Sequence, residues 1–153
     1  MTSLAENLNL ERIIDDVAKV IFVEHRRASF QRGWEYDSIP NVKCSSEKLA
    51  LAGFHYSGTA DEPTTAKCAF CMKEMIFDDT DDPWEEHVSH KPDCLFVKFA
   101  QQDQNQLTLE QSLQLIAYRQ VNAMGQWHDV MIDRLESGIN EFVNNSKLAT
   151  ADD

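Results

Sequence analysis

The chain of 153 residues carries 14 Lys or Arg and 26 Asp or Glu, which gives a formal net charge of −12. Because so acidic a chain repels phosphate backbones, direct binding to nucleic acid is disfavoured and a basic partner is favoured. No apolar run is long enough to cross a bilayer, and the amino terminus shows no apolar signal segment. We therefore expect no membrane contact and a location in the reducing cytoplasm or nucleus.

The first segment, residues 1–24, is predicted to be helical. Ser3 and Glu6 form a capping box, and apolar residues recur at intervals of three and four from Leu10 to Ile21. Such a face usually buries against its own domain, so the segment either covers the module that follows or binds a partner. The sequence leaves both uses open.

The central segment, residues 25–98, is predicted to be a compact module. Ser45 can cap a short helix that Gly53 ends. The expected core consists of apolar residues: Phe30, Trp34, Leu49, Leu51, Phe54, Phe70 and Phe96. Since so few apolar residues rarely stabilise a domain unaided, we expect a bound metal to contribute folding free energy.

Three cysteines and one histidine have the spacing of a zinc site: Cys68, Cys71, His87 and Cys94. Thiolates and imidazole are ligands that Zn²⁺ prefers, and four protein ligands close its tetrahedral shell, which predicts one structural rather than catalytic zinc ion. A Cys-x-x-Cys pair also occurs in thioredoxin-like redox sites, but there a helix starts at the motif, whereas polar and acidic residues follow it here. Asp82 and Pro83 instead predict a helix start that carries His87.

Six carboxylates lie within nine residues of one another: Asp78, Asp79, Asp81, Asp82, Glu85 and Glu86. Such a cluster is most often a solvated loop. It can also bind the ammonium group of a peptide amino terminus, with Phe77 as an aromatic floor for the first side chain and His90 nearby. The residues alone do not decide between these two interpretations.

A polar linker is predicted over residues 99–106, a long helix over 107–145 and a disordered acidic tail over 146–153. At 1.5 Å per residue the helix would be roughly 55 Å long, about twice the diameter of the module, so the module cannot cover most of its apolar stripe. We expect the helix to join a bundle with other chains; a hairpin folded back at Gly125 is the alternative. The expected partner-binding residues are Leu109, Leu113, Ile116, Trp127, Met131 and Leu135.

Several motifs together resemble the BIR repeat of the inhibitor-of-apoptosis family. The zinc-ligand spacing with Asp81-x-Pro83 before His87 carries the resemblance, the stretch from Arg26 to Trp34 is similar to the family's opening signature, and Leu49–Phe54 is similar to its alanine-glycine-phenylalanine turn. A single repeat followed by a long helix resembles the survivin/Deterin branch. The resemblance implies an α+β fold: a small zinc-binding module of short helices around a three-stranded antiparallel sheet, followed by one long carboxy-terminal helix.

The resemblance also implies how a peptide would bind. BIR repeats bind peptides that begin with alanine, and survivin-like members bind the phosphorylated amino-terminal tail of a histone. Asp81 aligns with the residue that holds the peptide ammonium group, His90 with a residue near the phosphate, and Lys73 with a basic residue on the same rim. Phe77 replaces the family's groove tryptophan, and Asp78 or its neighbour is expected to supply the charge of a second acidic residue.

Partners for the long helix follow from the same resemblance. They are a borealin-like helix, an inner-centromere-protein-like helix and, through this chromosomal passenger complex, Aurora B kinase. The implied location in mitosis is the centromeres and the spindle midzone. Homodimerisation is left open, because residues 101–106 are polar throughout and Ser112 stands where the family has an aromatic residue.

Three classes of function can be compared. An enzyme is disfavoured because the metal site is closed and the sequence shows neither a Ser/His/Asp set nor a glycine-rich phosphate loop. A RING-type ubiquitin ligase would need a second set of zinc ligands, and only Cys44 is left. A non-enzymatic adaptor that binds a peptide and docks through its helix fits every segment. A caspase antagonist is the alternative, but it would leave the long helix without a role.

Overall fold

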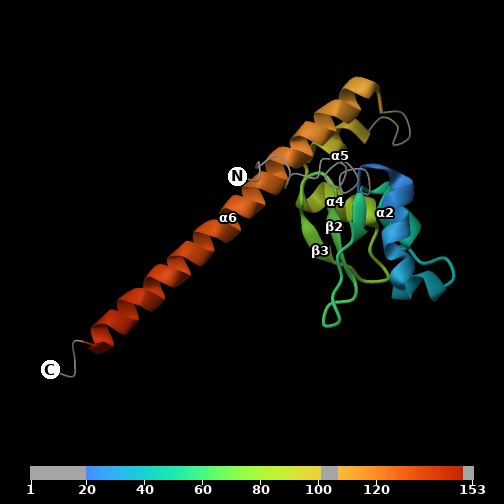
Figure 1. The fold of residues 1–153 in the computed structure, drawn as a ribbon. Coiled ribbons are helices and arrows are strands. Elements are labelled where there is room, and N and C mark those ends of the chain that lie inside the picture. The colour runs from blue at the N-terminus through green and yellow to red at the C-terminus, as the bar shows by residue number, and fades with distance from the viewer. Residues whose placement is uncertain (1–19, 101–106, 150–153) are drawn as a thin grey trace, which may run out of the picture. The chain divides into compact units, whose positions relative to one another are not determined.

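The computed structural model describes residues 20–100 and 107–149, and it divides the chain into two compact units, residues 1–119 and 120–153 (Figure 1). The helical segment expected over residues 1–24 therefore lies, up to residue 19, outside the described part. The elements in order are α2 (Val23–Ser29), the 3₁₀ turns η1 (Phe30–Arg32) and η2 (Glu35–Ser38), α3 (Ser46–Leu51), β1 (Phe54–Tyr56), β2 (Thr65–Cys68), β3 (Glu74–Ile76), α4 (Pro83–His90), α5 (Leu95–Ala100) and α6 (Leu109–Ala149).

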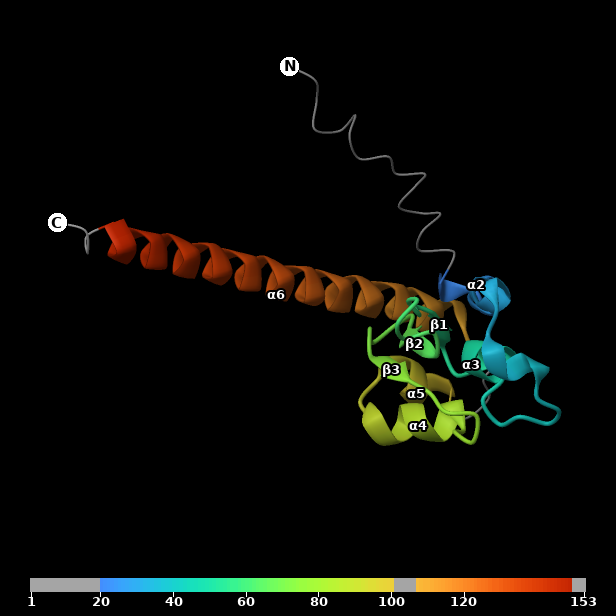
Figure 2. The same cartoon turned by 90° about the horizontal axis from the view of Figure 1, so that it is seen from below.

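The three strands form one antiparallel sheet in the order β1-β2-β3. Phe54 pairs with Cys68 across β1 and β2, so the last residue of β2 is also the first predicted zinc ligand. Helices α2 and α3 contact each other and β1, and both Figure 1 and Figure 2 place α4 and α5 beside the strands. This arrangement confirms the expected α+β class, with short helices around a three-stranded sheet.

Side-chain caps begin two of the helices as the sequence predicted. The amides of Trp84 and Glu85 donate to Oδ1 of Asp82 at 3.0 and 3.2 Å, which caps α4. The amide of Lys48 donates to Oγ of Ser45 at 3.3 Å and caps α3. Both predicted helix starts are confirmed, and the first of them directs His87 inward.

An aromatic core fills the first unit. Six of the seven expected core residues are buried, and Leu51 is half-buried. The rings of Phe70 and Phe96 stack with their centroids 4.7 Å apart. A β-carbon on Gly53, whose φ is +93°, would lie 2.9 Å from the Phe96 ring, so both the backbone conformation and the lack of space require glycine there.

Arg26 in α2 is an unexpected member of this core, with only 4% of its surface exposed. Its Nε donates to the carbonyl of Ala50 at 2.9 Å, and Nη1 donates to that of Val20 at 3.1 Å. The guanidinium carbon lies 5.5 Å from the ring centroid of Phe70 and 5.7 Å from that of Phe96. Burial lowers the pKa of Arg26 to about 10, so the side chain remains charged at neutral pH.

Two boundaries differ from those predicted. Helix α5 includes residues 99 and 100 of the expected linker 99–106, because Ala100 is buried in the core. Helix α6 runs unbroken through Gly125 to Ala149, so the alternative hairpin is wrong and residues 146–149 of the expected disordered tail are helical. That stretch contains no Gly or Pro to end a helix. Within the described ranges, no helix is both long and apolar enough to span a membrane.

His55 in β1 makes the stability of the first unit depend on pH. Burial lowers its pKa to about 4, and the nearby charges of Arg119 and Lys67 act in the same direction. As the pH falls from about 6.5 to 4, the unfolded chain therefore binds a proton that the folded chain does not, and the free energy of unfolding decreases by about 1–3 kcal/mol.

Urea unfolding of the zinc-loaded protein across this pH window checks the prediction. His55→Gln, which cannot gain the charge, should lose less stability in acid than the unmodified chain, whereas His128→Gln at an exposed position should behave like the unmodified chain. Equal pH dependence in all three proteins would contradict the assignment.

Candidate metal centre and binding surfaces

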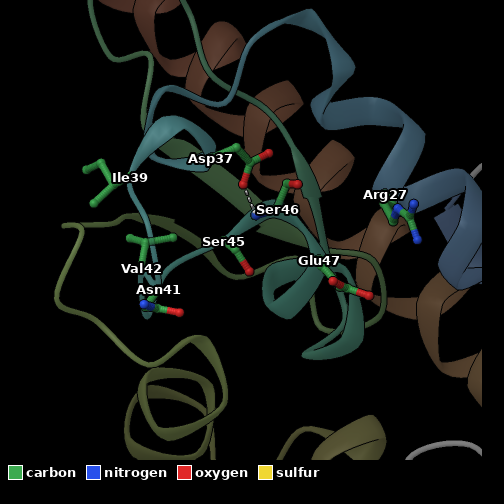
Figure 3. A pocket seen from close by; sticks show the side chains of 8 residues that line it. All are labelled: Arg27, Asp37, Ile39, Asn41, Val42, Ser45, Ser46 and Glu47. Carbon is green, nitrogen blue, oxygen red and sulfur yellow. Dashed lines mark hydrogen bonds between the residues drawn. The ribbon is translucent and has the colours of Figure 1, made fainter.

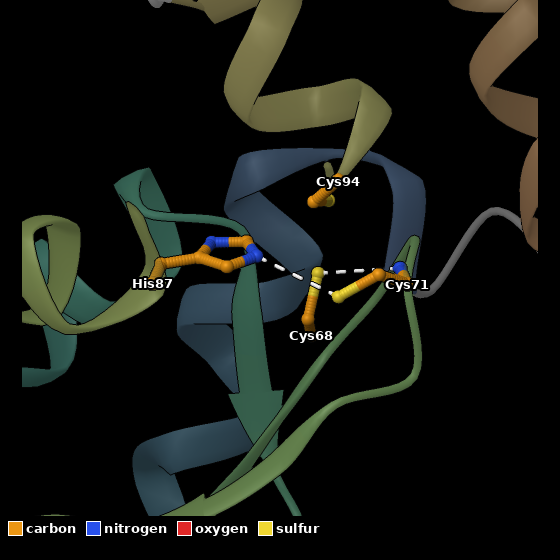
Figure 4. A group of neighbouring side chains, drawn as sticks. All are labelled: Cys68, Cys71, His87 and Cys94. Atoms are coloured by element: carbon orange, nitrogen blue, oxygen red, sulfur yellow. Dashed lines mark hydrogen bonds between the residues drawn. The ribbon is translucent and has the colours of Figure 1, made fainter. Parts of the chain in front are cut away.

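The four predicted zinc ligands come together inside the first unit (Figure 4). The ligand atoms of Cys68, Cys71, His87 and Cys94 lie within 4.8 Å of one another, and all four residues are buried. The end of β2 supplies the first cysteine, the following turn the second, α4 the histidine, and the residue before α5 the third cysteine. Segments far apart in the sequence thus meet at one point.

The geometry fits a tetrahedral zinc ion. Bonds of about 2.3 Å to sulfur and about 2.1 Å to nitrogen at a tetrahedral angle separate a sulfur from a nitrogen ligand by about 3.6 Å. Sγ of Cys71 lies 3.6 Å from Nε2 of His87. Nδ1 of His87 lies 2.8 Å from the carbonyl of Ala52, so a proton on Nδ1 donates to that carbonyl and leaves the Nε2 lone pair facing the thiols.

The surroundings act differently on the individual cysteine sulfurs. The amides of Phe70 and Cys71 donate to Sγ of Cys68 at 3.4 and 3.5 Å. Hydrogen bonds from the thiols of Cys68 and Cys71 hold the pKa of Cys94 far below its usual range, whereas burial raises the pKa of Cys68. Burial alone would lower the pKa of His87, but hydrogen bonds to Cys71 and Cys94 raise it to about 9. Zinc therefore displaces protons when it binds these atoms.

This set of ligands supports one structural Zn²⁺. Three thiolates and one imidazole complete a tetrahedral shell, so the protein leaves no coordination position for a substrate. A redox pair does not require a third cysteine and an imidazole around it, and the redox alternative for Cys68 and Cys71 is therefore set aside. The ion would crosslink the end of β2, helix α4 and the residue before α5, and its role would be structural.

Four of the five predicted peptide-binding residues lie around β3 and α4 with access to solvent. Lys73 precedes β3 and is exposed, as is Asp78 in the loop after it. Asp81 is half-buried, and its Oδ2 accepts a hydrogen bond from the amide of Asp78 at 2.8 Å. His90 ends α4, with Nδ1 3.3 Å from the carboxylate of Glu86. The carboxylate of Asp81 therefore also stabilises the loop that carries it.

The prediction for Phe77 is wrong. Its side chain is 1% exposed and meets the ring of Phe54 edge-on, with the centroids 5.2 Å apart, so it cannot form the floor of a peptide pocket. Neighbouring residues of an extended chain face opposite sides, and Ile76 in β3 is 60% exposed. Ile76 is therefore an apolar side chain that is accessible to solvent beside the acidic loop.

A polar depression of about 420 Å³ lies elsewhere in the unit, near η2 and α3 (Figure 3). Arg27, Asp37 and Glu47 contribute charged side chains to its lining. Asp37 Oδ1 accepts a hydrogen bond from the amide of Ser46 at 2.8 Å, which fixes η2 to the start of α3. None of the predicted peptide-binding residues lines this depression, so it is not the predicted peptide site.

Helix α6 presents the predicted partner-binding residues to different extents. The exposed fractions are 77% for Leu109, 58% for Leu113, 67% for Trp127 and 57% for Leu135, while Ile116 and Met131 are half-buried. In the first unit, Leu109 and Leu113 line an apolar groove of about 620 Å³ together with Phe22. In the second unit, Trp127 and Leu135 are the most exposed of the predicted set.

Sequence reasoning missed two contacts that α6 makes within the first unit. Leu115 is 1% exposed and packs in the aromatic core. Arg119 donates a hydrogen bond to the carbonyl of Ala69, between the first two zinc ligands. At 100° per residue, Leu115 lies about 120° around the helix from Trp127 and therefore on a different face from the predicted partner-binding residues. This difference in position could have indicated that Leu115 packs on its own domain.

Removal of zinc should unfold the first unit. Because metal binding supplies on the order of 10 kcal/mol of folding free energy in modules of this kind, a strong chelator should lower the melting temperature by roughly 20 °C or more. Near-ultraviolet circular dichroism of the buried Trp34 follows this transition. The control is the same chelator saturated with zinc, and identical melting curves in the two conditions would remove zinc from the account of stability.

Comparison with known proteins agrees with the site. Residues 26–98 match the Inhibitor of Apoptosis domain, BIR. The Caenorhabditis elegans protein named chromosomal passenger complex protein bir-1 is 37% identical over 122 residues, which are 80% of this chain and 76% of that protein. Baculoviral IAP repeat-containing protein bir-2 of the same organism is 38% identical over 136 residues, 86% of this chain but 43% of that protein.

A mammalian relative shows the same pattern. Mouse baculoviral IAP repeat-containing protein 5 is 31% identical over 107 residues, 69% of this chain and 74% of that protein. The chain thus spans less than half the length of bir-2 and about three quarters of the other two relatives. With its Cys₃His zinc site inside the matched region, the chain belongs to the inhibitor-of-apoptosis family and is similar to the survivin-like members.

Proposed function

We propose that this chain is a non-enzymatic adaptor, a survivin-like subunit of a chromosomal passenger complex that also inhibits apoptosis. In this proposal the BIR domain binds the amino terminus of a peptide, α6 binds partner helices, and the assembly targets Aurora B kinase in mitosis and cytokinesis. The relative bir-1 carries the name of that complex. The structural observation that supports the proposal best is the wide exposed apolar face of α6.

The width of this face favours more than one partner helix. In residues 120–144 of α6, exposed apolar side chains include Val121, Met124, Trp127, Val130, Ile132, Leu135, Ile139, Phe142 and Val143. At 100° per residue, Val130 and Val143 mark the two edges of an arc of about 220°, whereas a single helix pair needs a stripe of about 100°. A bundle that surrounds α6 on two sides would cover this arc.

The proposed occupants are a borealin-like helix and an inner-centromere-protein-like helix. Two such helices would cover the arc and leave the opposite, polar side of α6 in water, where Asp129, Asp133 and Glu136 lie. The apolar groove lined by Leu109 and Leu113 offers a further contact close to the BIR domain. This assembly would place the chain at centromeres and the spindle midzone.

The proposed peptide site is the acidic loop between β3 and α4. Asp78 and Asp81 supply negative charge for a peptide ammonium group, and the exposed Ile76 replaces Phe77 as the apolar surface for the first side chain. Lys73 and His90 are the basic groups for a phosphate. The ligand classes are alanine-starting peptides and a phosphorylated histone tail.

Trp127→Ala should weaken the binding of partner helices. A large apolar side chain buried at the centre of an interface contributes about 2 kcal/mol or more, which corresponds to roughly a 30-fold loss of affinity. Calorimetric titration of the full chain with the partner helices measures this loss. Glu136→Ala is the matched control, because nine residues along the helix place it about 180° from Trp127.

The outcome separates the two functions that the sequence left open. Normal zinc content with lost partner affinity in Trp127→Ala supports the adaptor. If Trp127→Ala and Glu136→Ala bind partner helices equally well, and the chain is found to bind a caspase, the caspase-antagonist function replaces the adaptor.

Asp81→Asn should weaken the binding of an alanine-starting peptide about tenfold or more, since it removes a charge that faces the ammonium group. The asparagine oxygen can still accept the hydrogen bond from Asp78, so the loop is preserved. Asp61→Asn, at an exposed position between β1 and β2 and outside the acidic loop, has the same change of charge and is the control. Fluorescence anisotropy with the free and the amino-terminally acetylated peptide measures the effect. Equal affinity for both peptides would show that the loop does not bind an ammonium group.

A further inference from the structure

We propose that Arg119 of α6 is a positioning residue of the zinc centre: it holds the turn between Cys68 and Cys71 and slows the release of zinc. The proposal depends on the zinc site and not on the proposed adaptor function. It gives the first turns of α6 a role inside the BIR domain, in addition to any role in binding partners.

The contact is directed at the metal-binding turn. Nη1 of Arg119 donates to the carbonyl oxygen of Ala69 at 2.5 Å and lies 3.8 Å from Sδ of Met72. Ala69 follows the first zinc ligand and Met72 follows the second, and their side chains are 0% and 6% exposed. The guanidinium therefore contacts both ends of the buried turn that presents two of the four ligands.

The turn is one that needs external support. Met72 has a φ of +62°, in the left-handed region that residues with a β-carbon rarely adopt. The same turn aims the amides of Phe70 and Cys71 at the sulfur of Cys68. If the turn relaxed, these two hydrogen bonds would be lost together with the alignment of the thiolates.

A second arginine holds the turn from α2. The guanidinium of Arg26 lies over the ring of Phe70, 5.5 Å from its centroid, while Arg119 binds the carbonyl of Ala69. Ala69 and Phe70, the two residues between Cys68 and Cys71, are thus each contacted by an arginine. One arginine comes from α2, before the zinc ligands in the sequence, and the other from α6, after them.

Charge adds to the effect of geometry. The two positive charges of Zn²⁺ and three thiolates sum to −1, and such a buried centre is stabilised by nearby cations more strongly than an exposed one. Arg119 is half-buried and hydrogen-bonded beside the cysteines, so it supplies such a cation. Residues outside the ligand shell commonly change metal affinity by about 10–100-fold, which sets the size of effect to expect.

The test measures zinc release from the full chain into an excess of a chromophoric chelator. Arg119→Ala should release zinc about tenfold faster or more than the unmodified chain. Arg119→Lys keeps the positive charge but loses the planar guanidinium group with its several donors. Its rate of zinc release should therefore lie between those of the unmodified chain and Arg119→Ala. Arg134→Ala, at an exposed position of the same helix, is the control and should release zinc at the unmodified rate.

A variant of Leu115 separates positioning from simple docking of the helix. Leu115→Val loosens the packing of α6 on the core but leaves Arg119 in place. Urea unfolding of the zinc-loaded proteins gives the stability that each variant loses. Faster zinc release in Arg119→Ala than in a Leu115→Val protein of similar stability supports the proposal.

Two results would overturn it. The first is that both Arg119→Ala and Arg119→Lys release zinc at a rate within about twofold of the unmodified chain, instead of about tenfold faster for Arg119→Ala. The other is equal acceleration by Arg119 and Leu115 variants of equal stability, which would mean that Arg119 acts only through helix docking. If Arg119→Ala does not fold, Arg119→Lys decides the first comparison.

Discussion

The first unit depends on the convergence of four side chains at a single zinc site. Its strands have three or four residues and its helices, apart from α6, six to eight, so each element buries little surface by itself. Zinc coordination connects the end of β2, α4 and the start of α5, and the stacked rings of Phe70 and Phe96 pack beside it. The metal therefore provides crosslinks that a larger domain would not need. Because all four ligands are buried, this crosslink uses none of the exposed side chains.

The long helix is used differently along its length. Leu115 and Arg119 bind it to the BIR domain, one through burial and the other through a hydrogen bond to the zinc-binding turn. Beyond Arg119, the exposed apolar residues cover more than half of its circumference, which is far more than a solvated helix tolerates without a partner. In the proposed function, this one helix connects the zinc-binding domain with partner chains.

The sequence predicted features set by local chemistry and missed those set by tertiary contacts. The zinc ligands and the caps Ser45 and Asp82 were predicted, because spacing and short-range hydrogen bonding determine them. Phe77 was assigned to the peptide site because it adjoins the acidic cluster and replaces the family's groove tryptophan, but its ring is buried against Phe54, a tertiary contact that the local sequence does not indicate. The burial of Arg26 and the contact of Arg119 with Ala69 join distant segments, and no local pattern indicates them.

X-ray absorption at the zinc edge tests the central claim most directly. The closed Cys₃His site predicts one zinc ion per chain, with three sulfur ligands at about 2.3 Å and one nitrogen ligand at about 2.0–2.1 Å. Such a shell would show that the four converging residues are the metal centre on which the BIR domain depends. A shell that contains an oxygen ligand, or fewer than three sulfur ligands, would mean that the site is open or assembled from other residues, and it would contradict the structural role assigned to zinc.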